Sequence, residues 1–348
     1  MTEPWFAKDA ALLLMECQKC NGEPYTYDEL RAMADAGIKN AIIFDVVWRD
    51  IEPAWGKYNW RALDERVALV NKAGMRAAIK WYTPPLPSYF PSDWWACASG
   101  GPIVGILSPW CPQAANYELQ MIDKVCRRYN DASLGNIVVS GIVGQGETPM
   151  QTVPAWYDAF AVADFRRVCG VDAELRYPDP NGRVTDPTYS WLKQSCLAML
   201  KRQGEMFIDN PWHTLFCAFQ PAFDGLLHWD CTGVQWLDDI LGMYNTLASD
   251  AQTVQIFYNW IGMEQFWANE AALSGKHHTL MFGGAEYCEG LRGKNSTHLA
   301  IENFMAGQVI APCHQFTGHN EVTPDMLSEI AWATGEWRAH RQKNTPAD

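Results

Sequence analysis

Residues 27–48 read YDELRAMADAGIKNAIIFDVVW and pass from a helical pattern into a strand pattern. The first part has the helical period and ends at Gly37, as helices often do. The second part, residues 41–48, is an apolar run of the kind that forms a buried strand. This stretch predicts a helix that feeds directly into a strand.

The same alternation of strand-like runs and helical stretches continues along the whole chain. The predicted strands are 11–16, 41–48, 77–81, 137–143, 213–219, 254–260, 278–283 and 309–313. The predicted helices are 27–37, 63–74, 116–129, 155–168, 191–206, 234–247, 264–273, 299–305 and 324–341. Strands that alternate with helices form parallel sheets through right-handed crossovers, and eight such units predict closure into a (β/α)8 TIM barrel.

The barrel is predicted to be a single domain spanning residues 1–348, with an extended crossover at about 148–212. An open doubly wound sheet is the alternative, but no glycine-rich phosphate-binding motif follows the first strand. The stretch 170–188 reads as an excursion between helices, since no block of residues is large enough for a second domain.

The composition narrows the class of partner. The 348 residues carry a net charge of −13, which argues against nucleic acid or an anionic membrane as a partner. The chain has 17 Trp, more than its 14 Phe or 13 Tyr, which suggests a cleft lined by flat rings as well as a core. No apolar run approaches the length of a membrane span.

The amino terminus and the cysteines predict a cytoplasmic protein. The first nine residues lack the basic start and apolar stretch of a secretory signal, and the 11 Cys read as reduced thiols. Cys17 and Cys20 form a lone CxxC that Cys97 and Cys111 could extend, but packing is the favoured interpretation. No metal and no cofactor is predicted.

Two glutamates at predicted strand ends are the candidate catalytic pair. Glu147 follows the fourth strand in the sequence GQGE, and Glu286 follows the seventh in GGAE. Chemistry in a barrel gathers at the carboxyl ends of its strands, so both carboxylates are expected at one mouth. A facing pair suits glycoside hydrolysis, in which one group donates a proton and the other attacks the anomeric carbon or activates water.

Other polar and aromatic residues at strand ends are candidates for substrate binding, because sugars offer hydroxyl edges to polar groups and C–H faces to rings. These candidates are Glu16, Asp45, Trp48, Arg49, Lys80, Trp81, Gln145, Gln220, Tyr258, Trp260 and His314. Arg49 and Lys80 could equally be structural partners of Asp45 or Glu16.

The tryptophans are expected to divide into two groups. Trp94, Trp95 and Trp110 lie in the loop after the third strand and could line an entrance. Trp156, Trp236, Trp267 and Trp332 are expected to pack between helices and barrel.

The first 90 residues resemble a known family. The series Trp48, Glu52-Pro53, Gly56-x-Tyr58 and Leu63-Asp64 is similar to the opening of clan A glycoside hydrolases, closest to family 42 β-galactosidases. The Thr83-Pro-Pro-Leu-Pro-Ser stretch and Phe165-Arg166 are also similar to that family. The resemblance implies a retaining β-glycosidase with Glu147 as acid/base, Glu286 as nucleophile and Tyr258 as a support for the nucleophile.

Two departures from the clan pattern support other interpretations. Gly146 stands where the clan usually has Asn, and no Trp follows the eighth strand. Family 14 β-amylases carry Gly-Glu at strand four and a Leu-x-Phe run before their strand-seven Glu, as Leu280-Met-Phe282 does here. Those enzymes invert and act on α-glucans. Glu289, three residues after Glu286, is a competing nucleophile.

A catalytically silent carbohydrate-binding barrel is the alternative from a different class, motivated by the missing Asn. A metal-dependent hydrolase is disfavoured because the first strand lacks an H-x-H motif and ends Glu16-Cys17-Gln18. The implied partner is an oligosaccharide or glycoside substrate, and a homo-oligomer is left open.

Overall fold

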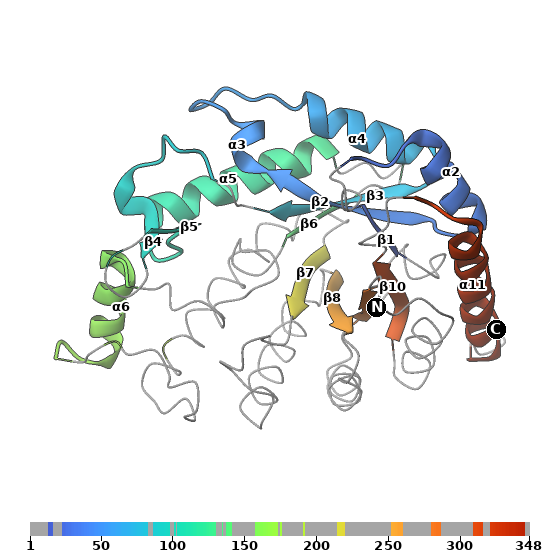
Figure 1. Ribbon diagram of the computed structural model, residues 1–348. Helices are drawn as coiled ribbons and strands as arrows, with labels where there is room; N and C mark the ends of the chain where they lie inside the picture. The colour runs from blue at the N-terminus through green and yellow to red at the C-terminus, as the bar shows by residue number, and fades with distance from the viewer. Residues whose placement is uncertain are drawn as a thin grey trace.

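The computed structural model describes the amino-terminal part of the chain almost continuously and the strands of the remainder (Figure 1). The described residues are 13–16, 23–82, 86–97, 101, 103–129, 134, 137–140, 157–172, 175, 191, 214–219, 252–259, 280–286, 309–315 and 321–344.

Eight parallel strands form a closed barrel. In chain order they are β1 (Leu13–Glu16), β2 (Asn40–Val47), β3 (Arg76–Tyr82), β6 (Ile137–Ser140), β7 (Thr214–Phe219), β8 (Gln252–Asn259), β9 (Leu280–Glu286) and β10 (Val309–Gln315). The pairing of β1 with β10 closes the ring, with Leu13 opposite Cys313. The predicted barrel of eight parallel strands is therefore confirmed, and every predicted strand overlaps an observed one.

The described helices are α2 (Tyr27–Ala36), α3 (Trp48–Ile51), α4 (Arg61–Lys72), α5 (Pro112–Tyr129), α6 (Ala159–Cys169) and α11 (Pro324–Asn344). All five of the longer ones overlap a predicted helix. The predicted helices 234–247, 264–273 and 299–305 lie outside the described residues, as do all but the first residue of 191–206, Trp191, which is helical. The single-domain organisation and the extended crossover stay predictions.

Two features of the fold differ from expectation. The loop after β3 contains a two-stranded antiparallel hairpin, β4 (Trp95–Cys97) and β5 (Ile103–Leu107). The seventh barrel strand runs on to Glu286, whereas the sequence predicted its end at Gly283. Glycines weaken the strand pattern, but pairing with β8 and β10 on both sides satisfies the backbone of this segment.

The core around β2 and β3 shows why the sequence folds locally as it does. Thr26 caps α2 through a reciprocal capping box with Glu29, so the helix begins where its first free amides find acceptors. Apolar residues from β2, β3, α2, α4, α5 and α11 then form one buried cluster. Apolar burial of this kind is the main source of stability in a helix-covered barrel.

The first and last described helices lie side by side at one edge of the barrel (Figure 1). Gly37 ends α2 with φ of 131°, and a Cβ built on it would lie 2.6 Å from Oγ1 of Thr334 on α11. Both the backbone angle and this close approach require glycine. The glycine that ends the predicted helix therefore also allows α11 to close the barrel.

Candidate active site

The carboxyl ends of the barrel strands bring several predicted site residues to one end of the ring. Glu286 is the last residue of β9 and lies opposite Gln315 of β10. Tyr258 of β8 is the register partner of Gly284, two residues before Glu286. His314 of β10 is the partner of Ala285. These positions surround the end of the seventh barrel strand.

The first three barrel strands contribute the next group of predicted residues. Glu16 ends β1 opposite Ile43, and on β3 Lys80 and Trp81 pair with Val139 and Ser140 of β6. Glu147 and Gln145 lie outside the described residues, as do Gln220 and Trp260, which directly follow β7 and β8. Glu289, Cys17 and Cys20 also lie outside them.

Asp45 lies at a bulge in β2. The register with β3 passes from Ile43 opposite Ile79 to Val46 opposite Trp81, so β2 carries one extra residue in this interval. The burial pattern changes phase across it, since Ala41 and Ile43 are buried before the bulge and Val46 after it. Bulges are common at barrel rims and beside active sites, where they redirect the chain.

Trp48 and Arg49 do not extend β2 but begin the short helix α3. Trp48 is 0% exposed, with its ring parallel to that of Tyr117 at 5.9 Å and edge-on to Phe90 at 5.1 Å. It therefore offers no ring face to a sugar, and its contacts are those of a packing residue. Arg49 is exposed, and its Nε lies 3.3 Å from Asp50 rather than against Asp45.

Glu52 is a residue that the site prediction missed. Its carboxylate is 0% exposed and accepts hydrogen bonds from Trp48 Nε1 at 2.9 Å, from the Gly56 amide at 2.7 Å and from the Tyr117 hydroxyl. Gly56 has φ of 67°, which lets the turn point its amide back at the carboxylate. The Trp, Glu and Gly of the family-like motif are thus the members of one hydrogen-bonded loop.

Aromatic rings surround this carboxylate. Trp55, which is 50% exposed, lies over Tyr117 at 4.9 Å and beside Trp94 at 5.6 Å. The Tyr89 hydroxyl donates to the backbone carbonyl of Glu52 at 3.2 Å. Burial, followed by the hydrogen bond to Glu52, raises the pKa of Tyr117, so its hydroxyl stays a donor.

The predicted entrance tryptophans belong to two different clusters. Trp94 is half-buried among the rings near Glu52, whereas Trp110 stacks on Trp191 at 4.7 Å, and Trp191 in turn meets Phe165 of α6 edge-on at 5.3 Å. Trp95 donates through Nε1 to the Phe90 carbonyl at 3.3 Å. Trp332 packs against the core as expected, and Trp156, Trp236 and Trp267 lie outside the described residues.

A second buried carboxylate joins the hairpin to α6. Asp158 caps α6 by accepting from the amides of Phe160 and Ala161, and it also accepts from the Ser108 hydroxyl at 2.8 Å. The Tyr157 amide donates to the Cys97 carbonyl at 2.9 Å. Burial raises the pKa of Asp158 despite these donors. The loop after β3 is therefore fixed to the segment that follows β6.

Two further tests concern titration and metals. Burial raises the pKa of the half-buried Glu118 on α5 to about 7, which makes it a carboxyl that exchanges a proton near neutral pH. Within the part of the chain that the structure describes, no three His, Cys, Asp or Glu side chains are arranged to hold a metal ion. None of the helices described there is long and apolar enough to cross a membrane.

The amino-terminal part of the chain matches a family model. The model described as β-galactosidase, glycoside hydrolase family 42, matches residues 22–96, which contain the Trp48–Glu52–Gly56 loop. This match confirms the resemblance predicted from the motifs of the first 90 residues. No curated protein is significantly similar to the chain in sequence.

Solved structures share the fold of nearly the whole chain. The catalytic domain of β-amylase from Paenibacillus polymyxa is similar with a TM-score of 0.68 at 12% identity, covering 96% of this chain and 98% of that one. β-Galactosidases from Marinomonas ef1 and Bacillus circulans sp. alkalophilus give TM-scores of 0.64 and 0.63, each at 12% identity over 95% of this chain.

The chain spans only 60% and 56% of those two β-galactosidases. At this identity the likeness defines the fold, and the fold is the barrel of glycoside hydrolases. The chain thus has the barrel of these enzymes, and its residues 22–96 resemble the family 42 β-galactosidases.

Proposed function

We propose that the chain is a glycoside hydrolase that cleaves β-glycosidic bonds with retention. The observation that carries this proposal is the family 42 match over residues 22–96 in a chain whose barrel is shared with glycoside hydrolases. The position of Glu286 at the end of the seventh barrel strand supports it, because barrel enzymes gather their chemistry at strand ends.

In this mechanism two carboxyl groups have opposite protonation states. Glu147, protonated, gives its proton to the departing glycosidic oxygen while Glu286 attacks the anomeric carbon and forms a covalent glycosyl-enzyme. Glu147, now ionised, then takes a proton from water, and that water releases the sugar with its original configuration. Retention requires the two carboxyl groups to lie about 5–5.5 Å apart.

Substrate binding is assigned to the remaining residues of the mouth. Polar side chains would bond hydroxyls and rings would stack on sugar faces. The proposed set is Glu16, Asp45, Arg49, Lys80, Trp81, Gln145, Gln220, Tyr258, Trp260 and His314. Trp48 is left out of it because its side chain is fully buried.

The test replaces each candidate nucleophile in the full chain. Aryl β-galactosides and related aryl glycosides are assayed with wild type, Glu286→Ala and the matched control Glu289→Ala. We expect Glu286→Ala to lose at least about a thousandfold in kcat, and azide to restore part of the turnover. Near wild-type rates in Glu286→Ala would exclude this residue as nucleophile, and a loss confined to Glu289→Ala would transfer the role.

A second candidate is an inverting α-glucan hydrolase. The observation that favours it is the β-amylase catalytic domain, of which the chain covers 98%, whereas it covers 60% or less of the β-galactosidases compared here. Maltooligosaccharides are the discriminating substrates, and proton NMR of the first product identifies its anomer. Turnover of α-glucans with inversion would replace the retaining assignment.

A catalytically silent carbohydrate-binding barrel is the candidate outside enzyme chemistry. It is motivated by Gly146, which stands where clan A enzymes usually carry Asn. Calorimetry with the same oligosaccharides separates it from both enzymes, because binding without turnover on any substrate would exclude hydrolysis.

A further inference from the structure

Glu52 connects three segments that the barrel mouth depends on. Its carboxylate binds Trp48 and Gly56 on the loop after β2 and Tyr117 on α5, and its backbone carbonyl binds Tyr89 on the loop after β3. The donors lie up to 65 residues away in sequence. A single buried carboxylate therefore holds the ends of two neighbouring barrel strands to the helix that follows them.

The strand end nearest to this carboxylate is the one with the bulge. A bulge interrupts the ladder and leaves its extra residue without a pairing partner, so contacts beyond it must fix the direction of the chain. In β2 these contacts begin at Trp48, three residues after Asp45. Trp48 is held by Glu52 through Nε1 and by the rings of Tyr117 and Phe90.

The partners of Glu52 make its contacts specific to a carboxylate. Three neutral donors converge on two oxygens, and an amide in place of the carboxylate has a single oxygen to accept from them. Rotating the amide would satisfy either Trp48 or the pair Gly56 and Tyr117, but never all three. The loop can therefore adopt its full set of contacts only with Glu52.

We propose that Glu52 is a positioning residue of the substrate site, acting through the bulged end of β2, residues 44–47, which carries Asp45. This inference rests on the proposed function in one respect, namely that Asp45 contacts the sugar. Glu52 itself is fully buried and touches no substrate. Its part is to hold the end of β2 in the orientation that binding requires.

The experiment compares Glu52→Gln and Tyr117→Phe with Glu65→Gln, a control that removes an exposed glutamate bound only to Arg61 on its own helix. Kinetics are measured on the best aryl glycoside, and amide hydrogen exchange is followed over residues 40–51. We expect KM to rise roughly tenfold in Glu52→Gln with kcat changed less than about twofold, since weakened ground-state and transition-state binding raises KM alone. Exchange at residues 44–51 should be faster, and the control should match wild type.

The two readouts separate failure of the inference from failure of the proposed function. If kcat falls in proportion to the folded fraction while KM stays unchanged, Glu52 is only structural and the inference is overturned. Unchanged exchange at residues 44–51 overturns it whatever the activity. If wild type hydrolyses no glycoside, the proposed function fails, and the inference is then decided by exchange together with oligosaccharide affinity from calorimetry, which must weaken in Glu52→Gln.

Discussion

Glu52 and Asp64 are two carboxylates in neighbouring parts of the chain that solve the same problem differently. Each accepts a hydrogen bond from a tyrosine of α5 that lies 65 residues further on, Tyr117 for Glu52 and Tyr129 for Asp64. Glu52 is completely buried and has only neutral donors. Asp64 is 39% exposed and is paired with Arg128 at 2.5 Å.

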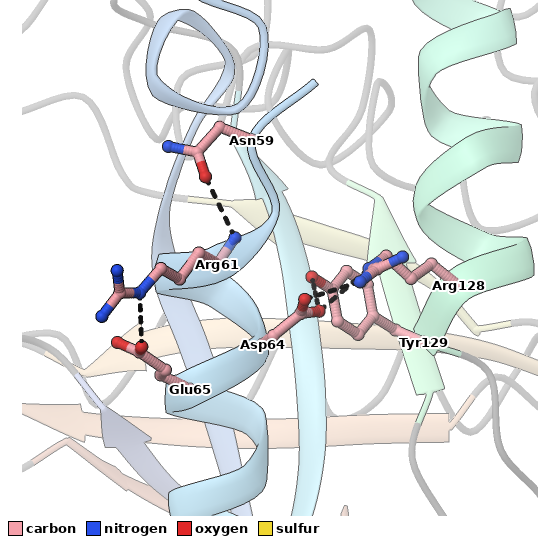
Figure 2. A network of polar contacts seen from close by, with 6 residues as sticks. All are labelled: Asn59, Arg61, Asp64, Glu65, Arg128 and Tyr129. Atoms are coloured by element: carbon pink, nitrogen blue, oxygen red, sulfur yellow. Dashed lines mark hydrogen bonds and ion pairs between the residues drawn. The ribbon is translucent and has the colours of Figure 1, made fainter. Parts of the chain in front are cut away.

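Figure 2 shows the second arrangement, in which Arg128 and Tyr129 reach from α5 to Asp64 on α4. The guanidinium holds the pKa of Asp64 below its ordinary value and also lies 5.4 Å from the ring of Trp60. Arg61 and Glu65 form a further pair on the outer side of α4. This network lies where water can replace any lost contact, whereas water cannot replace the contacts of Glu52.

The difference teaches that burial, and not the number of partners, decides what each carboxylate contributes. Exposed ion pairs contribute little because water screens them. A buried carboxylate with satisfied donors contributes modestly while it is intact, but its removal leaves each donor unpaired at a cost of about 1–3 kcal/mol per group.

The largest expected effect is on the unfolding free energy of Glu52→Ala. We expect a loss of about 3–4 kcal/mol, because Trp48, the Gly56 amide and Tyr117 lose their acceptor and a cavity opens. Asp64→Ala should lose about 1 kcal/mol or less. Denaturant unfolding followed by tryptophan fluorescence measures both, and equal losses would contradict the role assigned to burial.

The two tyrosines offer a more closely matched comparison, since each change removes one hydroxyl from α5. Tyr117→Phe should cost about 2 kcal/mol, because one donor to a fully buried carboxylate is lost. Tyr129→Phe should cost about 1 kcal/mol or less, since Arg128 still binds Asp64. Thermal and denaturant unfolding of the two variants decide the order, and a larger loss in Tyr129→Phe would reverse the comparison.

The smallest expected effect is on the acid limb of the stability curve. Arg128 lowers the pKa of Asp64 in the folded chain, so the unfolded state takes up its proton first as the pH falls. The stabilisation by Asp64 is therefore present above about pH 4 and is lost as the pH falls through the lowered pKa.

Asp64→Asn should flatten this limb by about 1 kcal/mol or less, an upper limit set by solvent screening. The wild-type contribution should also shrink in 1 M salt, where the Debye length is about 3 Å. Unfolding between pH 3 and pH 6 at low and high salt provides the measurement. An acid limb that is the same in Asp64→Asn and wild type would remove Asp64 from the account.

Much of the barrel could be predicted because its signals are local. Apolar runs placed all eight strands, and the glycine after residues 27–36 marked the end of α2. The position of Glu286 at a strand end was likewise readable, although the strand continues three residues past the predicted end at Gly283. Periodicity reports which residues face a core, and that information lies within a few residues of each position.

The roles of Trp48 and Glu52 could not be predicted in this way. Trp48 stands at a strand end and has the side chain of a sugar platform, yet Phe90 and Tyr117 cover it. Glu52 was visible only as a letter of the family motif, and no local pattern indicates that Tyr117 would reach it. A hydrogen bond across 65 residues depends on how α5 packs against the strands, which no window of sequence contains.

The sequence by itself determined the order of strands and helices, the barrel they close into and the resemblance of residues 22–96 to family 42. Only the tertiary structure decided the bulge at Asp45, the hairpin after β3 and the burial of the Glu52 loop. The physical reason is that backbone periodicity is set by neighbouring residues. The environment of a carboxylate or an indole is set by distant segments that meet only when the barrel closes.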